Sequence, residues 1–393
     1  MTSELSPDRV VIVEPRCLGL EHVPFNAALI AMAASAYQGA QIHIYGDAEH
    51  LAGLTEILTH TRPGVLGQLR FHPLELPARK VKGKARMLWG WQLMRRLDRE
   101  FRADLPTALL IATTDPYILT IIKARMLGRW SRIPVAVVFH EILSVLKRRR
   151  LRSVQWWSFK AALTAPHPRR LTYVVLSASI RDRLAEIASA MNKHVIAIDH
   201  PSLVGAMPLR RPTPPGAPLR FGFVGGGREK KGLRDFVDLA VSVRSGHPAV
   251  SFEVVGSAPA GLPGSAKAQL TWSEHKLPLE EFVERLRRLT HVVWLGDPGH
   301  YDLVASGSLV DAVALGIPVI CLYGGFVDHL FASLGNIGIR CETLADVERE
   351  VVRLVRSASN LSTAEHERAG ARTQPLLPET WAPVLRDALE RSR

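Results

Sequence analysis

The sequence predicts an α/β protein with two Rossmann-like, doubly wound domains that face each other across a cleft. Three observations lead to this prediction. Short β-rich runs alternate with helical patterns in the first half of the chain, the alternation resumes in the second half, and a proline-rich stretch separates the two halves. Such alternation is typical of parallel sheets whose strands are joined by crossover helices.

In the first half, runs rich in Val, Ile and Leu predict the strands, and apolar helical patterns fill the spaces between them. The segment 25–38 is apolar throughout and is too short to span a membrane, so it predicts a buried helix. The predicted strands of this half are 10–15, 41–46, 107–115, 135–140 and 172–177.

The second half repeats this pattern. Amphipathic segments predict helices at 232–245, 279–289, 308–316 and 344–359. Short apolar runs predict strands at 219–225, 250–256, 291–296 and 318–323.

The domain boundaries follow from a change in proline content and hydrophobic periodicity between the two halves of the chain. The segment 201–218 contains six prolines and has no hydrophobic periodicity, which is typical of a linker. We therefore expect an N-terminal domain over 1–205, a linker over 206–218 and a C-terminal domain over 219–375. We also expect a C-terminal helix over 376–393 that packs back on the N-terminal domain.

The composition is that of a globular protein, with 47% hydrophobic and 22% charged residues among 393. Three scattered cysteines imply neither a disulfide framework nor a metal-binding spacing, and no secretion signal or membrane-spanning run is visible, so we expect a cytoplasmic protein. The net charge of +13 is uneven, since the first 203 residues hold 28 Lys and Arg against 16 Asp and Glu. A basic first domain favours anionic partners.

A glycine-rich loop, "FVGGGREKKG", follows the predicted strand 219–225. Gly225, Gly226 and Gly227 allow backbone amides to approach a ligand closely, and the next helix points its positive end at the same space. Arg228 and Lys231 are the usual cationic ligands of phosphate. The pattern is neither a P-loop nor a dinucleotide fingerprint, so it indicates either a phosphate cradle or a tight turn with solvated charges.

A second motif, "HYDLVASGSLVDAVALGIPVI" over 300–320, has small residues before a helix. Ser306 or Ser308 can cap this helix, and Asp311, near its first turn, is free to hydrogen-bond sugar hydroxyls. Either this is simply a capped crossover helix, or a second helix N-terminus helps to hold a diphosphate.

These two motifs together resemble the nucleotide-sugar domain of GT-B glycosyltransferases, most closely the retaining, family 4-type branch (glycosyl transferases group 1). The resemblance is specific over 219–325. It implies that Arg228 and Lys231 contact the diphosphate of the donor, and that Asp311 holds the ribose. It also implies that the backbone amides of Gly307, Ser308 and Leu309 bind the phosphates.

One feature departs from the family pattern, which usually has a pair of glutamates in this segment. Asp311 stands in the place of the second, and the residue eight positions before it is Leu303, with Asp302 one position away. A variant form with this spacing occurs among bacterial sugar transferases, and the sequence is closer to it.

Candidate acceptor-side residues lie after strands of the first half. Gly19, His22 and Asn26 belong to a loop and helix start that, in the resembling family, line the acceptor side; a capped helix is the alternative. His140 and Glu141 end a strand, and the family has a strand-end His near the reacting sugar. Asp115 ends another strand, although Asp-Pro is also ordinary turn chemistry.

Two stretches, 79–96 and 146–160, mix cations with tryptophan. Basic residues attract anionic headgroups and Trp favours the membrane interface, so these stretches predict attachment to a membrane surface. The alternatives are a solvated charge run or, less favoured because no motif accompanies the charge, nucleic-acid binding. The residues assigned to this surface are Lys147, Arg148, Arg149, Arg150, Trp156 and Trp157.

The leading interpretation is a glycosyltransferase that moves a sugar from a nucleotide-diphosphate donor to a lipid-linked saccharide acceptor. By resemblance, the setting is bacterial exopolysaccharide or O-antigen assembly at the inner face of the plasma membrane, with retention at the anomeric carbon. We expect no metal or other cofactor, because the cations can neutralise the diphosphate. If the enzyme inverts, then Asp115, Glu141 or His140 is the base. Two alternatives are a sugar-nucleotide enzyme such as a UDP-sugar 2-epimerase and a non-catalytic membrane-surface protein of the same fold.

Overall fold

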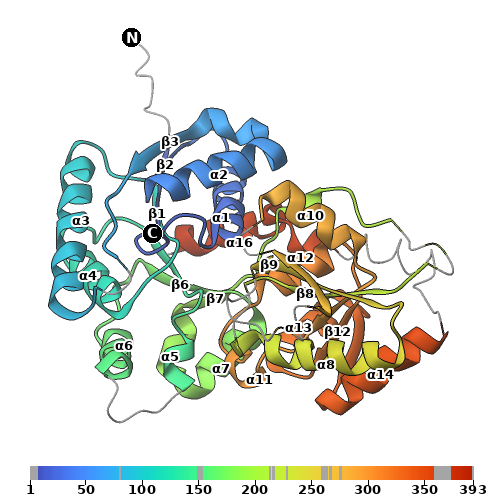
Figure 1. Ribbon diagram of the computed structural model, residues 1–393. Helices are drawn as coiled ribbons and strands as arrows, with labels where there is room; N and C mark the ends of the chain where they lie inside the picture. The colour runs from blue at the N-terminus through green and yellow to red at the C-terminus, as the bar shows by residue number, and fades with distance from the viewer. Residues whose placement is uncertain are drawn as a thin grey trace. The chain divides into compact units, whose positions relative to one another are not determined.

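The computed structural model describes residues 8–78, 81–147, 154–211, 214, 217–226, 229–257, 264, 268–273, 277–357 and 373–391 (Figure 1). The chain divides into two compact units. Unit 1 comprises Met1–Pro201, Leu303–Ala305 and Pro378–Arg393, and unit 2 comprises Ser202–Asp302 and Ser306–Leu377. Each unit is built on one parallel sheet with helices, which confirms the predicted fold class of two doubly wound α/β domains.

The sheet of unit 1 has seven strands in the order β3-β2-β1-β4-β5-β6-β7. The strands are β1 Arg9–Val13, β2 Gln41–Gly46, β3 Leu69–Pro73, β4 Ala108–Ile111, β5 Val135–Val138, β6 Leu171–Val175 and β7 Val195–Ala197. Strands β4, β5 and β6 are buried at every position, because helices cover both faces of the sheet. The strand order reverses between β1 and β4, and ligands of such sheets bind beyond the carboxyl ends of the strands at this switch point.

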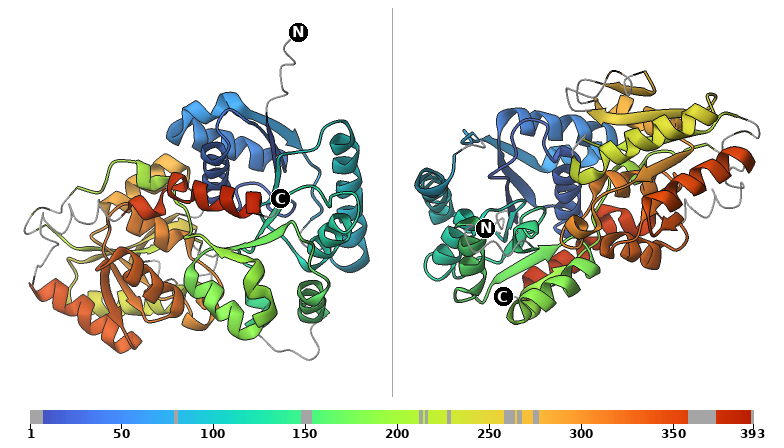
Figure 2. Two further views of the ribbon diagram at one scale, coloured as in Figure 1. Left: turned by 180° about the vertical axis from the view of Figure 1, so that it is seen from behind. Right: turned by 60° about the horizontal axis from the view of Figure 1, so that its bottom comes forward.

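The helices of unit 1 are α1 Val23–Ala36, α2 Ala48–Thr61, α3 Gly83–Ala103, α4 Pro116–Met126, α5 Ser144–Lys147, α6 Val154–Thr164, α7 Ala178–Ile187 and α16 Pro378–Arg391, with 3-10 turns η1 Pro63–Gln68 and η2 Ser189–His194. Helix α1 is buried over almost its whole circumference, because α2 and α16 both pack against it. The C-terminal helix α16 thus belongs to unit 1, and it lies beside α1 in the views of Figure 2.

Unit 2 contains a six-stranded sheet in the order β10-β9-β8-β11-β12-β13. Its strands are β8 Arg220–Val224, β9 Ser251–Ser257, β10 Leu270–Ser273, β11 His291–Trp294, β12 Val319–Leu322 and β13 Gly338–Cys341. Its helices are α8 Leu233–Gly246, α10 Leu279–Arg288, α11 Pro298–Tyr301, α12 Gly307–Ala314, α13 Gly325–Leu334 and α14 Leu344–Ser357, with 3-10 turns η3 Val204–Ala206, η4 Glu229–Lys231 and η5 Gln374–Leu376.

The core of unit 2 lies between its sheet and the pair α8 and α14, which run side by side in Figure 1. Phe221, Phe236 and Phe252 are fully buried there, with ring centroids of neighbouring rings 5.4 and 5.7 Å apart. The strand order reverses between β8 and β11, so the switch point of this sheet lies next to the loop that follows β8.

Candidate functional site

The loop after β8 and the start of α12 meet at the carboxyl end of the unit 2 sheet. The Lys231 ammonium donates to Ser308 Oγ at 3.3 Å. Gly225 has a φ of 103°, and a Cβ built on it would lie 2.6 Å from Lys231 Nζ and 3.1 Å from Ser308 Oγ. The backbone conformation therefore favours glycine at this position, and a Cβ there would also displace the Lys231 ammonium. We call Gly225, Lys231, Ser308 and Asp311 the Lys231 cluster.

Two positive elements converge in this cluster. The first amides of an α-helix have no intrahelical acceptor, and the helix dipole places partial positive charge at the same end. Here that end belongs to α12, and Lys231 Nζ lies against its second residue, Ser308. A cation beside a helix N-terminus is electrostatically unfavourable in isolation and becomes favourable when an anion binds between them.

Asp311 lies one turn into α12 and is half-buried. Its Oδ1 accepts a hydrogen bond of 2.7 Å from Ser202 Oγ, so one of its carboxylate oxygens is engaged within the protein, contrary to the expectation of a free carboxylate. Burial raises the pKa of Asp311 to about 6, and the Ser202 hydrogen bond and Lys231 oppose that rise. No sequence pattern marks Ser202 as a partner of Asp311, because the two residues lie 109 positions apart in the chain.

The backbone amides at the start of α12, which were predicted to bind phosphate, differ in whether they are already hydrogen-bonded within the protein. The Leu309 N–H donates to Ser306 Oγ at 3.4 Å, which makes Ser306 the N-cap and engages one of the predicted phosphate donors. Ser306 is itself held by Trp294 Nε1, which donates to its Oγ at 3.2 Å. Ser306 is thus a buried structural cap, and Gly307 and Ser308 supply the amides at the helix tip.

The remaining donor-side predictions are only partly covered by the structure. Gly226 follows Gly225 in the loop, whereas Gly227 and Arg228 lie outside the described residues. After them, Gly232 has a φ of 77° and a Cβ there would lie 2.3 Å from the Leu295 carbonyl oxygen. The loop is further fixed by the Asp297 N–H, which donates to the Lys230 carbonyl at 3.1 Å.

Unit 1 has a hollow of about 580 Å³ at the carboxyl ends of its own strands. It is lined by Arg16, His22, Arg86, Asp115, His140 and Glu141, among others. The structure therefore brings four of the six predicted acceptor-side and catalytic residues of this region to one surface, whereas Gly19 and Asn26 do not line it.

Glu14, which the sequence analysis did not single out, organises the loop that leads to this hollow. Its side chain is 2% exposed and accepts hydrogen bonds from Arg16 N (2.8 Å), Cys17 N (3.0 Å) and Asn26 Nδ2 (2.9 Å), as well as from Thr113 Oγ1. A buried carboxylate needs such donors to offset its lost hydration. The available signal was an acidic residue at the end of an apolar strand.

Asn26 and Gly19 belong to the hydrogen-bond network around Glu14 that fixes the loop before α1. The Asn26 amide also lies 2.9 Å from His50 Nε2, and it is 3% exposed, so its position favours a structural role. His50 Nδ1 lies 2.9 Å from the Gly19 carbonyl oxygen, and the Gly19 N–H donates to Asp47 at 2.9 Å. These contacts hold the loop in front of α1.

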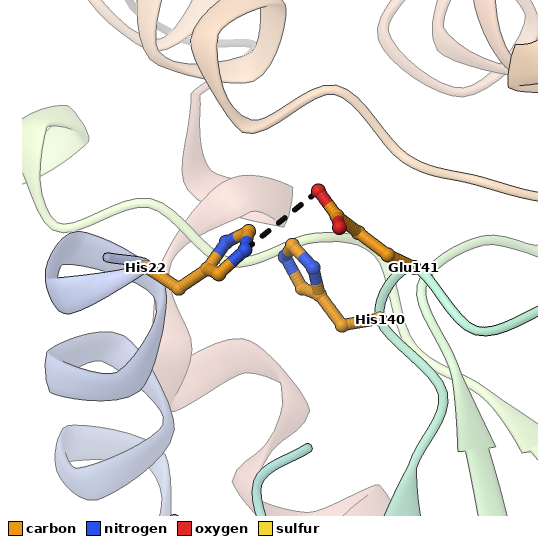
Figure 3. A group of neighbouring side chains, drawn as sticks. All are labelled: His22, His140 and Glu141. Carbon is orange, nitrogen blue, oxygen red and sulfur yellow. Dashed lines mark ion pairs between the residues drawn. The ribbon is translucent and has the colours of Figure 1, made fainter. Parts of the chain in front are cut away.

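His22, His140 and Glu141 converge beside the hollow, as Figure 3 shows. The His22 and His140 ring centroids lie 4.2 Å apart, and His22 Nε2 lies 3.7 Å from Glu141 Oε1. Burial, followed by the neighbouring His22 and His200, lowers the pKa of His140 well below its ordinary value. His140 is therefore neutral at physiological pH and can act as a hydrogen-bond acceptor or ligand.

Asp115 is more constrained than the sequence suggested. Its Oδ1 caps α4 by accepting from Tyr117 N (2.9 Å) and Ile118 N (3.0 Å). Its Oδ2 accepts from Arg86 Nε at 2.8 Å, and Arg86 also donates to the Pro15 carbonyl. These contacts favour a role in shaping the hollow over that of a general base.

The predicted membrane-surface residues are described only in part. Arg148, Arg149, Arg150 and the side chain of Lys147 lie outside the described residues. Trp156 and Trp157 lie on α6, where Lys160 Nζ sits 4.9 Å from the Trp156 ring centroid. Trp157 is 49% exposed.

No protein-family model matches this sequence, and no curated protein matches it either. Solved structures do match over nearly the whole chain. A sucrose-phosphate synthase from Thermosynechococcus elongatus is 12% identical, with 98% of each chain covered and a TM-score of 0.65. Medicago truncatula UGT71G1, solved in complex with UDP-glucose, is 11% identical, with 98% of each chain covered and a TM-score of 0.53.

The solved structures that match this chain also include a putative UDP-N-acetylglucosamine 2-epimerase from Listeria monocytogenes. It is 11% identical, with 96% of this chain and 94% of that chain covered and a TM-score of 0.57. At such identities the likeness shows the fold alone, which is the predicted GT-B fold. It does not separate sugar transfer from epimerisation, a distinction that depends on the site residues.

Proposed function

We propose that this protein is a glycosyltransferase that takes a sugar from a nucleotide-diphosphate donor, and that unit 2 holds the donor. The observation that carries the proposal is the Lys231 cluster, in which an ammonium, a glycine turn and a helix N-terminus meet at the switch point of a GT-B sheet. The similarity to UGT71G1, which was solved in complex with UDP-glucose, supports it.

The chemistry follows from the charge that develops on the leaving group. When the bond between the anomeric carbon and the β-phosphate oxygen breaks, its electron pair stays on that oxygen, and the sugar becomes oxocarbenium-like. Lys231 and the Gly307 and Ser308 amides would stabilise the departing charge by electrostatics that are in place before reaction. Arg228, by the family resemblance, adds a second cation, so we propose that the donor side needs no divalent metal.

Asp311 fits the proposed contact to the ribose only through the oxygen that Ser202 does not use. Its pKa of about 6 leaves it mostly ionised at neutral pH, when a carboxylate is the better acceptor for two ribose hydroxyls. Retention at the anomeric carbon, with His140 close to the reacting sugar, is the finer proposal that the family resemblance suggests.

We further propose a lipid-linked saccharide acceptor, presented to unit 1 at the cytoplasmic face of a membrane. A second hollow of unit 1 supports this proposal, because Arg95, Arg99, Arg102 and Arg129 line it together with the 38% exposed Trp91. Leu88 on the same helix α3 is 60% exposed. Arginine beside exposed apolar side chains suits an anionic lipid surface.

This attachment would be peripheral. Among the helices formed by the described residues, none is both long and apolar enough to cross a membrane. The arginine hollow extends the predicted basic stretch 79–96 along α3. Bacterial exopolysaccharide or O-antigen assembly is the setting that the resemblance suggests.

A screen of nucleotide sugars by thermal shift tests the donor assignment, since a ligand that binds the folded state raises its apparent stability. We expect stabilisation by one class of UDP- or GDP-linked sugar. The preferred donor is then incubated with membrane extract, and transfer of labelled sugar to a lipid fraction is the expected result. No stabilisation by any nucleotide sugar would contradict the proposal.

The 2-epimerase neighbour favours one second candidate, an enzyme that inverts a centre of a UDP-sugar without an acceptor. Product analysis after incubation with the donor alone distinguishes the two. An epimerised nucleotide sugar would support this candidate, whereas an unchanged donor that turns over only with acceptor would support transfer.

A further inference from the structure

Two imidazoles and a carboxylate meet where α1 begins and β5 ends. His22 is the residue that precedes α1, and His140 and Glu141 lie just beyond the end of β5, after Phe139. One ligand atom from each of the three side chains lies within 4.8 Å of the other two. All three side chains belong to unit 1 and line its hollow, where Figure 3 shows them pointing toward one another.

His140 has an unexplained polar atom in this group. The residue is 8% exposed, and its Nδ1 is buried without a hydrogen-bond partner among the described residues. Buried polar atoms are nearly always satisfied, so an orphaned ring nitrogen calls for a missing partner. A neutral imidazole carries a lone pair on one of its ring nitrogens, and this lone pair can bind a cation.

His22 adds a second unusual feature. Its φ of 51° makes it the one non-glycine residue with a positive φ in the part of the chain that the structure describes. Such a backbone costs about 1 kcal/mol or more for a residue of this kind, and strain of this sort gathers at ligand sites. The conformation turns the His22 ring toward His140 and Glu141.

We propose that His22, His140 and Glu141 bind one divalent transition-metal ion, with zinc as the best match. Two imidazoles and one carboxylate are ligands that zinc and its neighbours prefer, whereas magnesium and calcium prefer oxygen ligands alone. Three protein ligands leave one position open. Here that position faces the hollow, where an oxygen of a hydroxyl or phosphate group would complete the coordination.

The spacing is close to what such an ion requires. In a four-coordinate site with metal–ligand bonds of about 2.0–2.2 Å, two ligand atoms lie about 3.3–3.6 Å apart. The 3.7 Å between His22 Nε2 and Glu141 Oε1 is close to this separation. The widest separation in the group, up to 4.8 Å, needs a small movement, which the 47% exposed Glu141 side chain can supply.

The test uses the whole chain and zinc alone as the probe. After removal of bound metal with a chelator, wild-type protein is dialysed against zinc and its metal content is measured by mass spectrometry. We expect one zinc per chain in the wild type. The zinc affinity of Glu141→Gln should be at least about tenfold weaker, because replacing even a residue that only hydrogen-bonds to a metal ligand typically lowers metal affinity by that factor. Glu141→Gln changes an exposed side chain of the same shape, so loss of folding does not obscure the result.

Two further variants sharpen the test. His140→Ala should lose zinc as well, whereas His60→Ala, which removes an exposed histidine of α2, should bind zinc as the wild type does. Zinc should also raise the unfolding temperature of the wild type and of His60→Ala by more than that of Glu141→Gln. Substoichiometric zinc in the wild type, or equal zinc affinity in wild type and Glu141→Gln, would overturn the proposal. Since neither donor nor acceptor enters this experiment, its failure would leave the proposed sugar transfer untouched.

Discussion

The two sheets of this protein carry different side chains at their carboxyl edges, although both have the strand order 3-2-1-4-5-6, to which unit 1 adds a seventh strand. At the carboxyl edge of unit 2, small residues bring Lys231 to the tip of α12, so the edge is built to accept negative charge. At the corresponding edge of unit 1, His22, His140 and Glu141 line a hollow whose walls are fixed by the buried Glu14. One edge suits a phosphate, and the other suits hydroxyl or metal chemistry.

This difference shows how one architecture can serve two roles. A phosphate site needs close backbone approach, so it depends on glycines and on a helix end, with few side chains. A site that handles hydroxyl groups or metal ions needs side chains with tuned basicity, so it depends on burial and on hydrogen bonds that fix each ring. The predictions below separate the two edges experimentally.

The largest expected effect is on the unit 2 edge. Lys231→Ala should reduce kcat/KM by about 30- to 1000-fold, or about 2–4 kcal/mol, because the departing diphosphate loses a preorganised cation. The neighbouring Lys230→Ala is the matched control, since its side chain is exposed and should leave the rate nearly unchanged. Wild-type kcat/KM in Lys231→Ala would remove the basis for the donor assignment.

The next effect concerns unit 1 and the membrane. Neutralising Arg95, Arg99 and Arg102 of α3 with glutamine should weaken binding to anionic vesicles by about 3 kcal/mol, or about 100-fold, at about 1 kcal/mol for each charge. Donor affinity should not change. Vesicle co-sedimentation measures the binding.

The control for this variant is a triple glutamine substitution on α14 in unit 2, at Arg349, Arg353 and Arg356. It removes the same charge from another exposed surface, where Arg349 pairs with Asp346 and Arg353 with Glu350. Equal loss of vesicle binding in both variants would show that only net charge matters and that α3 is not the docking face.

A third prediction tests why glycine occupies position 225. Gly225→Ala should weaken donor binding about tenfold or more, because the added Cβ meets Lys231 Nζ and Ser308 Oγ in addition to the strain at a φ of 103°. Gly39→Ala, at a φ of 80° with open space around it, carries the strain alone. Both variants should lose about 1 kcal/mol of unfolding free energy, and isothermal titration with donor should distinguish them. Equal donor affinity in the two would indicate that the space beside Lys231 is not used.

The smallest effect is a pH dependence from Asp311. Its pKa rises from 3.8 to about 6 on folding, so the folded state keeps a proton that the unfolded chain releases, and the unfolding free energy falls as pH rises between these values. A shift of this size corresponds to about 3 kcal/mol at most. Because the Asp311 side chain is only half-buried and solvent screens it, urea unfolding should show a fall of about 1–2 kcal/mol in the wild type and not in Asp311→Asn. Parallel pH curves for the two proteins would show that Asp311 is not held in the buried setting described.

Inner and outer strands differ in how well the sequence predicts them. Every inner strand of both sheets was predicted, because burial on both faces requires a continuous apolar run, as in β4 and β11. The four outer strands, β3, β7, β10 and β13, were not predicted. Each has one partner strand and contains partly exposed residues. β7 is apolar but only three residues long, and the other three strands mix polar and apolar residues, so no long apolar run marks any of them.

Prediction of the site residues was also limited: residues explained by local chain geometry could be predicted, whereas contacts between residues far apart in the sequence could not. Gly225 and Lys231 could be predicted because local chain geometry explains them. Ser202 and Arg86 could not, since each acts on a carboxylate far away in the sequence, Asp311 and Asp115 respectively. The contact between Lys231 and Ser308 joins residues 77 positions apart, and only the family resemblance anticipated it.

The most direct test is a crystal structure of the protein soaked with uridine or guanosine diphosphate. The account predicts the β-phosphate within hydrogen-bonding distance of Lys231 Nζ and of the amides at the tip of α12, with the bond between Lys231 and Ser308 opened to admit it. A diphosphate bound at another surface, with Lys231 still donating to Ser308, would contradict the assignment of unit 2 as the donor site.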